Sequence, residues 1–258
     1  MTWFERIMFI VLCCLFSTTF VVETSTASDI TVSAALSLKA PFEEMGRIYE
    51  RQHKGSRVVF NFGPSGALQK QIEAGAPVDI FASASPKEID ALEGSGFIIV
   101  GTRADFAGNT IVLITASKAR VAVSSLGDLK KKEIERIAIG NPATVPAGKY
   151  TEESLKNLGH WENVKTKVIY AEHVRQVMDY VSRGEVDAGM VFLTDAISRS
   201  SDLKVTAEVP TSSHKPIVYT IAVIKGSTNE AAAKSFISLV LSKEGKEVLR
   251  KHGFKATP

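Results

Sequence analysis

The chain has 258 residues, of which 45% are hydrophobic, and a formal net charge of +3. This positive charge is small and spread along the sequence, so the composition does not indicate a nucleic-acid-binding protein. Two cysteines and five histidines without close spacing argue against thiolate and histidine metal centres, and we expect no metal site.

Residues 1–27 have the features of a secretory signal peptide. Arg6 precedes an apolar stretch of about fourteen residues, FIVLCCLFSTTFVV, and the small residues that end at Ala27 are suitable for cleavage. The stretch is too short to span a membrane comfortably, and an uncleaved anchor is the alternative. Because Cys13 and Cys14 lie inside it, the exported protein is expected to have no thiol and no disulfide. We therefore expect a periplasmic protein whose roughly 230 mature residues fold around an ordinary hydrophobic core.

The first part of the mature chain alternates strands and helices. Short apolar runs predict buried strands at residues 30–35, 57–62 and 78–82, and apolar residues at three- and four-residue steps predict a helix after each of the first two. After the third strand, Ser85-Pro86-Lys87-Glu88 supplies an N-cap, a proline at the first helical position and a capping-box glutamate. This β-α-β-α-β-α order predicts a parallel sheet with helices on both faces.

A second alternating set follows, enclosed by two long apolar strands at 110–115 and 217–224. Within it we predict, in chain order, a strand at 136–139, a helix at 146–158, a strand at 167–170, a helix at 172–183, a strand at 186–192 and a short helix from Thr194 and Asp195. Two amphipathic helices, at 230–241 and 243–252, complete the chain.

This order of elements predicts an α/β protein of two lobes, each a mostly parallel sheet flanked by helices, with two crossing strands as the hinge. We expect lobe 1 to comprise residues 28–109 and 217–258, and the inserted lobe 2 to comprise residues 110–216.

Ser65 lies in a motif with two interpretations. Gly63-Pro64-Ser65-Gly66-Ala67 departs by one residue from the nucleophile elbow G-x-S-x-G of serine hydrolases. The same strand-to-helix turn also offers a hydroxyl, free N–H groups and a positive helix end to a bound oxyanion. A hydrolase needs a histidine on the same rim of the sheet, and no histidine is well placed in the predicted fold, since His252 falls inside the terminal helix. The hydrolase is therefore the weaker alternative.

Ligands of open parallel sheets bind beyond the carboxyl ends of the strands. Small or hydroxylic residues occupy four such strand-to-helix junctions, two in each predicted lobe, at residues 35–38, 62–66, 145–148 and 171–174. Taken singly, each has an ordinary structural explanation: Ser37 as an N-cap, Pro146 as a helix-start residue and His173 as a surface or capping residue.

Five segments of the sequence together resemble one family. ITVSAALSLKAPFEEM, SGALQKQIEAGAPVDIFASAS, IGNPATVPAGKYTEESLKNLG, AEHVRQVMDYVSRGEVDAGMVFLTDA and SHKPIVYTIAVI resemble, in order and spacing, the periplasmic molybdate-binding proteins of ABC importers. The resemblance implies a type II periplasmic-binding-protein fold that closes on one tetrahedral oxyanion, molybdate or tungstate. It further implies a monomer without enzymatic activity or cofactor, which delivers its ligand to an ABC permease in the inner membrane.

The resemblance also implies a set of ligand-binding residues. Ser37 and Ser65 match the family's two serines, and Ala147 and Val174 match its two backbone N–H donors from the other lobe. The family's fifth contact is a tyrosine hydroxyl in a G-x-V-Y segment, but this chain has GMVF, so Phe192 lines the pocket without donating. The lost hydrogen bond is worth about 1.5 to 3 kcal/mol, or about ten- to a hundredfold in affinity. A receptor for another tetrahedral oxyanion, such as sulfate, is therefore the alternative of the same class.

Overall fold

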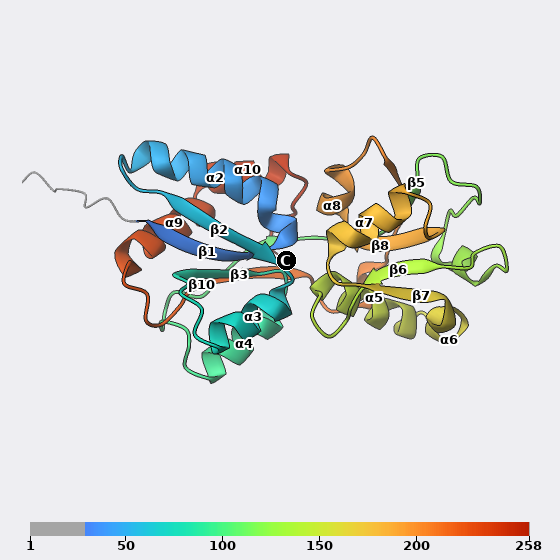
Figure 1. Cartoon of the computed structure of the whole chain (residues 1–258), viewed down its shortest axis with the longest axis horizontal. Helices are drawn as coiled ribbons and strands as arrows, with labels where there is room; N and C mark the ends of the chain where they lie inside the picture. The colour runs from blue at the N-terminus through green and yellow to red at the C-terminus, as the bar shows by residue number, and fades with distance from the viewer. Residues whose placement is uncertain (1–28, 258) are drawn as a thin grey trace, which may run out of the picture.

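The computed structural model describes residues 29–257, which form two lobes side by side (Figure 1). Each lobe is built on a sheet that helices flank, as the sequence predicted. Each sheet has five strands and is mixed rather than mostly parallel. The predicted signal peptide, with Cys13 and Cys14, lies outside the described residues. Within 29–257, no helix has the length and apolar character needed to cross a membrane.

Lobe 1 contains the sheet formed mainly by the N-terminal part of the chain. In spatial order its strands are β2 (Val58–Gly63), β1 (Ile30–Ala35), β3 (Ile80–Ser83), β10 (Val218–Val223) and β4 (Ala104–Gly108). Strand β1 runs parallel to β2 and β3, whereas β10 is antiparallel to β3 and β4. The residues of β1 and β3 are almost all buried, which explains their continuous apolar sequence.

Helices cover both faces of the lobe 1 sheet. The helices α2 (Lys39–Gln52), α9 (Glu230–Leu241) and α10 (Lys243–Lys251) pack into one hydrophobic cluster with the sheet. The helices α3 (Ser65–Glu73) and α4 (Pro86–Gly94) form a second cluster around Phe81 and Ala222. The C-terminal segment therefore completes the lobe that the N-terminal segment begins.

Lobe 2 repeats this arrangement. Its strands are, in spatial order, β7 (Val168–Ala171), β6 (Ile137–Gly140), β8 (Ala188–Phe192), β5 (Ile111–Ala116) and β9 (Leu203–Glu208). Strand β6 is parallel to β7 and β8, and β5 is antiparallel to β8 and β9. The helices of this lobe are α5 (Pro146–Asn157), α6 (Trp161–Val164), α7 (Val174–Ser182) and α8 (Leu193–Ile197).

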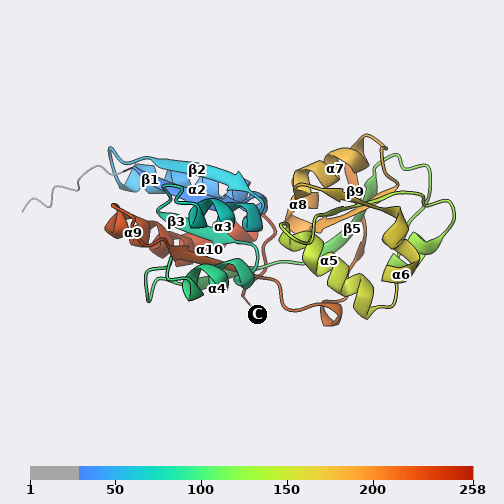
Figure 2. The ribbon, with the colours of Figure 1, turned by 60° about the horizontal axis from the view of Figure 1, so that its bottom comes forward.

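The chain passes between the lobes at two places, which Figure 2 shows as connections between the two bodies. The first is the short step from β4 to β5 at Asn109 and Thr110, and the second is the segment 209–217 between β9 and β10. The two long apolar strands that the sequence singled out are the strands that follow these passages. Each of them belongs to the sheet of one lobe.

Two details differ from the sequence predictions. Strands β4 and β9 were not predicted, because neither has the continuous apolar run on which the other strands were recognised; the alternation of Leu203, Val205 and Ala207 with polar residues in β9 was missed. The capping-box role of Glu88 was wrong. Ser85 does cap α4 by accepting from the Lys87 N–H, but the Ser85 N–H donates to Ser83 Oγ, and Glu88 accepts from that same hydroxyl.

Candidate functional site

The four strand-to-helix junctions singled out in the sequence meet where the lobes face each other. Ser37 lies in a short 3-10 helix, η1 (Leu36–Leu38), after β1, and Ser65 is the first residue of α3, after β2. In lobe 2, Ala147 lies in the first turn of α5 and Val174 is the first residue of α7. Because first-turn N–H groups have no partner inside their own helix, these positions present donors and the positive ends of helix dipoles.

A cavity of about 410 Å³ lies between the lobes, and Ser37 and Val174 both line it. Thr194 and Asp195 of α8 line the same cavity from lobe 2. A second hollow, of about 370 Å³, is lined by Pro64 and other residues of both lobes. Ser65 and Ala147 line neither hollow, since both are fully buried. The structure thus brings Ser37 and Val174 to one cavity and holds Ser65 and Ala147 beneath the surface.

The lobes touch beside Ser65. The N–H of Gly66 donates to the carbonyl of Thr144, in the turn before α5, over 3.1 Å. A methyl group on Gly66 would approach the Thr144 backbone to 3.0 Å, so a larger residue here would have to push the two turns slightly apart. The same closeness recurs within lobe 2, where a methyl group on Gly148 would lie 1.8 Å from the carbonyl oxygen of Gly140. Glycines therefore set how near these turns can approach.

The surroundings of Ser65 fit a donor better than a nucleophile. Its Oγ accepts a hydrogen bond from the N–H of Ala84 over 3.1 Å, which leaves the hydroxyl proton available for another acceptor. The hydrogen bonds of the described histidine rings go to other partners, such as Glu44 for His252 and Gln176 for His173. No histidine base of a hydrolase thus contacts Ser65 within residues 29–257.

Ser37 belongs to a chain of polar groups that crosses from lobe 1 to lobe 2. Its Oγ lies 2.9 Å from the hydroxyl of Tyr219 on β10. Asn109 donates from Nδ2 to that same hydroxyl over 3.1 Å and to Thr194 Oγ1 over 2.9 Å. Burial raises the pKa of Tyr219 well above its usual value, and the nearby Asp195 carboxylate raises it further. The tyrosine therefore stays protonated at any physiological pH.

Sequence reasoning missed Tyr219, Asn109 and Thr194. One signal was present, because Tyr219 and Thr220 are polar residues in an otherwise apolar buried strand, and a buried tyrosine hydroxyl nearly always has a hydrogen-bond partner. The partner itself lies 182 positions away in the sequence, so only the fold reveals it.

Phe192 is the last residue of β8 and is 2% exposed. Its ring lies 5.8 Å from the ring of Tyr219, centroid to centroid, and Phe192 is not among the residues that line the 410 Å³ cavity. Phe192 therefore packs against Tyr219, and its predicted place in the lining of the ligand pocket stays a prediction.

His173 is the N-cap of α7, as one sequence interpretation had it. Its Nδ1 accepts from the N–H of Gln176 over 3.1 Å. This cap fixes the first turn of α7 and with it the backbone of Val174.

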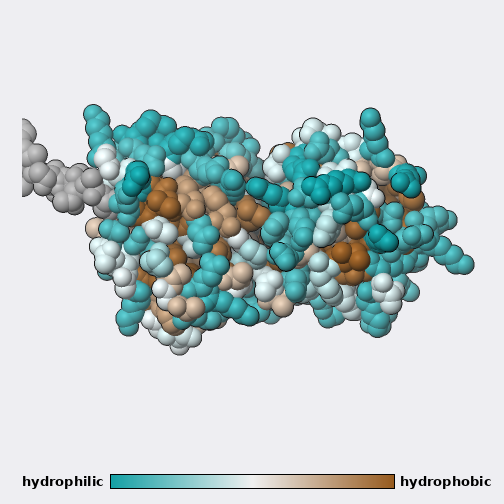
Figure 3. Space-filling view, viewed as in Figure 1, coloured by the Kyte–Doolittle hydropathy of each residue, from teal (hydrophilic) through white to brown (hydrophobic). Residues whose placement is uncertain are grey.

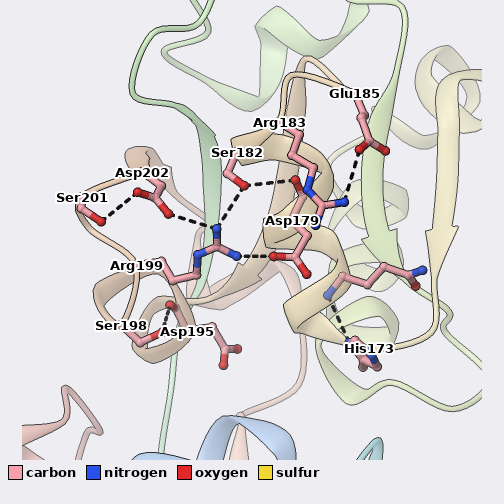
Figure 4. A network of polar contacts seen from close by, with 11 residues as sticks. His173, Asp179, Ser182, Arg183, Glu185, Asp195, Ser198, Arg199, Ser201 and Asp202 are labelled. Carbon is pink, nitrogen blue, oxygen red and sulfur yellow. Dashed lines mark hydrogen bonds and ion pairs between the residues drawn. The ribbon is translucent and has the colours of Figure 1, made fainter.

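Asp195 is a buried acid in the wall of the cavity. Desolvation raises its pKa to about 7, although the Phe192 N–H and the positive charge of Arg175 both act to lower it. Its Oδ2 has no hydrogen-bond partner in the described part of the chain. Figure 4 shows the contrast with neighbouring Arg199, whose guanidinium binds Asp179, Ser182 and Asp202.

Charged side chains also line the cavity, among them Arg175 and the buried Asp195. Lys39, Arg199, Lys251 and His252 all line it, and all of them have acidic partners at or near the surface. Figure 3 shows mostly hydrophilic residues on this face where the lobes meet. No cluster of His, Cys, Asp and Glu suited to a metal ion occurs among residues 29–257. The chemistry available at the four junctions is that of uncharged N–H and O–H donors.

Comparisons with known proteins point to one family. The model of the family described as bacterial extracellular solute-binding protein matches residues 30–255. The molybdate-binding protein ModA of Haemophilus influenzae is 37% identical over 235 residues, which cover 89% of this chain and 91% of that protein. ModA of Escherichia coli is 36% identical over 230 residues, 87% of this chain and 88% of that protein.

Solved structures agree on the fold. The periplasmic molybdate-binding protein of Azotobacter vinelandii superposes with a TM-score of 0.79 at 24% identity, covering 89% of this chain and 100% of that one. The sulfate-binding protein SubI of Mycobacterium tuberculosis superposes with a TM-score of 0.77 at 16% identity, covering 89% and 87%. Because the names of these two proteins give different oxyanions, the shared fold does not by itself choose between them.

Proposed function

Because this chain belongs to the bacterial extracellular solute-binding protein family, we propose that it captures molybdate, and also tungstate, between its lobes and delivers it to an ABC permease in the inner membrane. The observation that carries the proposal is that Ser37 of lobe 1 and Val174 of lobe 2, both at helix starts, line one cavity between the lobes. Ser65 and Ala147, the other two proposed donors, are buried at the helix starts that flank the contact of Gly66 with Thr144. Two relatives named molybdate-binding proteins, similar over nearly the full length, support the choice of ligand.

Uncharged donors suit a small dianion. Hydroxyls and first-turn N–H groups stabilise the negative charge by partial charges and helix dipoles, so no lysine or arginine has to be desolvated in the site. The four proposed donors themselves offer no acceptor for an additional proton, and they therefore favour a fully deprotonated oxyanion over hydrogen phosphate. Sulfate has the same charge and shape as molybdate, so the size of the site must separate them.

Ligand binding then favours the closed arrangement of the lobes. An anion that takes donors from both lobes binds the closed form more tightly than the open form and shifts the population accordingly. The hydrogen bond from Gly66 to Thr144 already joins the two lobes beside the proposed site. The permease would recognise this closed form.

The remaining parts of the proposal concern the chain as a whole. Residues 1–27 would be removed on export to the periplasm, and the mature monomer would divide into lobe 1 (28–109 and 217–258) and lobe 2 (110–216). It would act without a cofactor and without catalytic activity.

Calorimetric titration of the mature protein, residues 28–258, tests the proposal with molybdate, tungstate, sulfate and phosphate side by side. We expect one molybdate or tungstate per chain, weaker binding of sulfate and no heat from phosphate. If neither molybdate nor tungstate binds, the proposal is wrong. If sulfate binds more tightly than molybdate, a sulfate receptor is favoured. A fluorophosphonate probe tests the hydrolase alternative, and we expect no label on Ser65.

A further inference from the structure

We propose that Tyr219 is a positioning residue of the oxyanion site, whose hydroxyl donates to Ser37 Oγ and so leaves the Ser37 proton to point at the bound anion. The inference rests on the proposed function, because it assigns Ser37 a role as a donor to a tetrahedral oxyanion. It is carried by the geometry of Ser37, Tyr219, Asn109 and Thr194.

The donors and acceptors of these hydrogen bonds can be assigned starting from Asn109. The Thr110 N–H donates to Asn109 Oδ1 over 2.9 Å, so the amide oxygen faces the backbone and the amide nitrogen faces the other way. Nδ2 then supplies both of its protons, one to Thr194 Oγ1 and one to Tyr219 Oη. Asn109 is 7% exposed, so the described protein groups, rather than bulk water, set this orientation.

The proton count at Tyr219 follows. Its oxygen accepts from Asn109, and its single proton needs an acceptor because the side chain is completely buried. The described acceptor within reach is Ser37 Oγ, 2.9 Å away. Because Ser37 Oγ accepts the hydrogen bond from Tyr219, the hydroxyl proton of Ser37 is left for another acceptor. An anion in the cavity that Ser37 lines would be that acceptor.

The ring of Tyr219 is held in place independently of its hydroxyl. It packs against Phe106 at 6.1 Å, Phe192 at 5.8 Å and Phe254 at 5.2 Å, centroid to centroid. The hydroxyl is therefore fixed in space, and a donor that is oriented before the ligand arrives loses less entropy on binding. A chain of polarised hydrogen bonds also strengthens its last member.

The chain spans both lobes. Asn109 lies at the passage between β4 and β5, and Thr194 belongs to α8 of lobe 2, which lines the same cavity as Ser37. The orientation of a lobe 1 donor is thus set through residues of the hinge and of lobe 2. In this chain, where Phe192 carries no hydroxyl, Tyr219 supplies the tyrosine hydroxyl next to the site.

The test is the substitution Tyr219→Phe, which keeps the ring and removes the hydroxyl. We expect molybdate affinity, measured by titration calorimetry, to fall about tenfold, the size of one lost hydrogen bond to a charged acceptor. The matched control is Tyr49→Phe, because Tyr49 is also a buried lobe 1 tyrosine and its hydroxyl donates to the Ala232 carbonyl within the α2 and α9 packing. Its affinity should stay within about twofold of the wild type.

A double-mutant cycle separates positioning from a merely structural role. If Tyr219 acts through Ser37, Tyr219→Phe should change affinity less than about twofold in the Ser37→Ala background. Equal losses in both backgrounds, or an unchanged affinity of the single variant, would overturn the inference. The bound stoichiometry and thermal unfolding of each variant report its folded fraction.

Further experiments separate a failure of this inference from a failure of the proposed function. Should Tyr219→Phe not fold, Asn109→Asp replaces the donor to Tyr219 by a carboxylate that takes its proton, and its affinity loss should shrink in the Ser37→Ala background. If the wild type binds sulfate instead of molybdate, the proposed ligand is wrong and the same variants are compared with sulfate. A wild type that binds no tetrahedral oxyanion overturns both the proposed function and the inference.

Discussion

The two lobes bring different donors to their common junction. In the proposed site, lobe 1 would offer the side-chain hydroxyls of Ser37 and Ser65, whereas lobe 2 would offer the backbone N–H groups of Ala147 and Val174 at the starts of α5 and α7. A hydroxyl can rotate, so each one is held by another group: Tyr219 contacts Ser37, and the Ala84 N–H binds Ser65. A backbone N–H needs no such partner, because the helix itself sets its direction.

This difference determines which substitutions remove the proposed donors of each lobe. A point substitution removes a lobe 1 hydroxyl directly, with little effect on the backbone. The proposed lobe 2 donors are backbone N–H groups, which no side-chain substitution removes directly. They are lost only when the first turn of the helix moves. The largest effects are therefore expected from substitutions that displace a lobe 2 helix.

The largest effect is expected from Gly148→Ala. Its methyl group would lie 1.8 Å from the Gly140 carbonyl oxygen, so the first turn of α5 must shift and take the N–H of Ala147 with it. We expect molybdate affinity to fall by more than about a hundredfold and the free energy of unfolding to fall by about 2 to 4 kcal/mol. The control is Gly94→Ala in α4, where nothing lies within 4 Å of the added methyl group. Wild-type affinity in Gly148→Ala would contradict a donor role for this turn.

The next effect concerns the buried acid of lobe 2, Asp195. Its pKa is raised to about 7 by desolvation, so the folded state holds a proton that the unfolded state loses near pH 4. The contribution of the protonated Asp195 carboxyl to the free energy of unfolding is fully present below about pH 4 and is lost as the pH rises through about 7. Full ionisation costs the folded state about 4 kcal/mol.

The substitution Asp195→Asn removes this titration. Between pH 4 and pH 8 we expect the variant to gain up to about 4 kcal/mol of unfolding free energy relative to the wild type, measured by urea unfolding at each pH. Asp202→Asn is the control, because Arg199 lowers the pKa of that exposed carboxyl and its stability contribution is lost at low pH instead. Parallel pH profiles for wild type and Asp195→Asn would show that the acid is not desolvated.

The sequence predicted the buried strands and the junctions well and the polar chain of the site poorly. Strands such as β1 and β3 are buried along their length, so their apolar runs are visible to any pattern argument. Edge strands β4 and β9 lack that pattern. The contact of Ser37 with Tyr219 joins residues 182 positions apart, and neither local propensity nor periodicity carries information at that range.

A smaller loss is expected from Ser65→Ala in lobe 1. The substitution removes a proposed hydroxyl donor and leaves the buried Ala84 N–H without its acceptor. We expect affinity to fall about ten- to a hundredfold and the free energy of unfolding to fall by about 1 to 3 kcal/mol, measured by calorimetry and urea unfolding. Ser238→Ala, at an exposed position of α9, serves as control because its hydroxyl only donates to the Lys234 carbonyl. A loss of stability with unchanged affinity would remove Ser65 from the site.

The smallest effect, and the only expected gain of molybdate affinity, comes from Phe192→Tyr. The new hydroxyl would extend from a ring that packs beside Tyr219. If it reaches the anion, it restores the tyrosine donor that the resemblance to molybdate-binding proteins implies at this position. We expect molybdate to bind up to about tenfold more tightly by calorimetry. The control is Phe97→Tyr, since Phe97 packs with the α3 and α4 cluster of lobe 1. An unchanged affinity would instead indicate that Tyr219 and Ser37 already supply what Phe192 lacks, because a fifth donor adds little to an anion whose acceptors are satisfied.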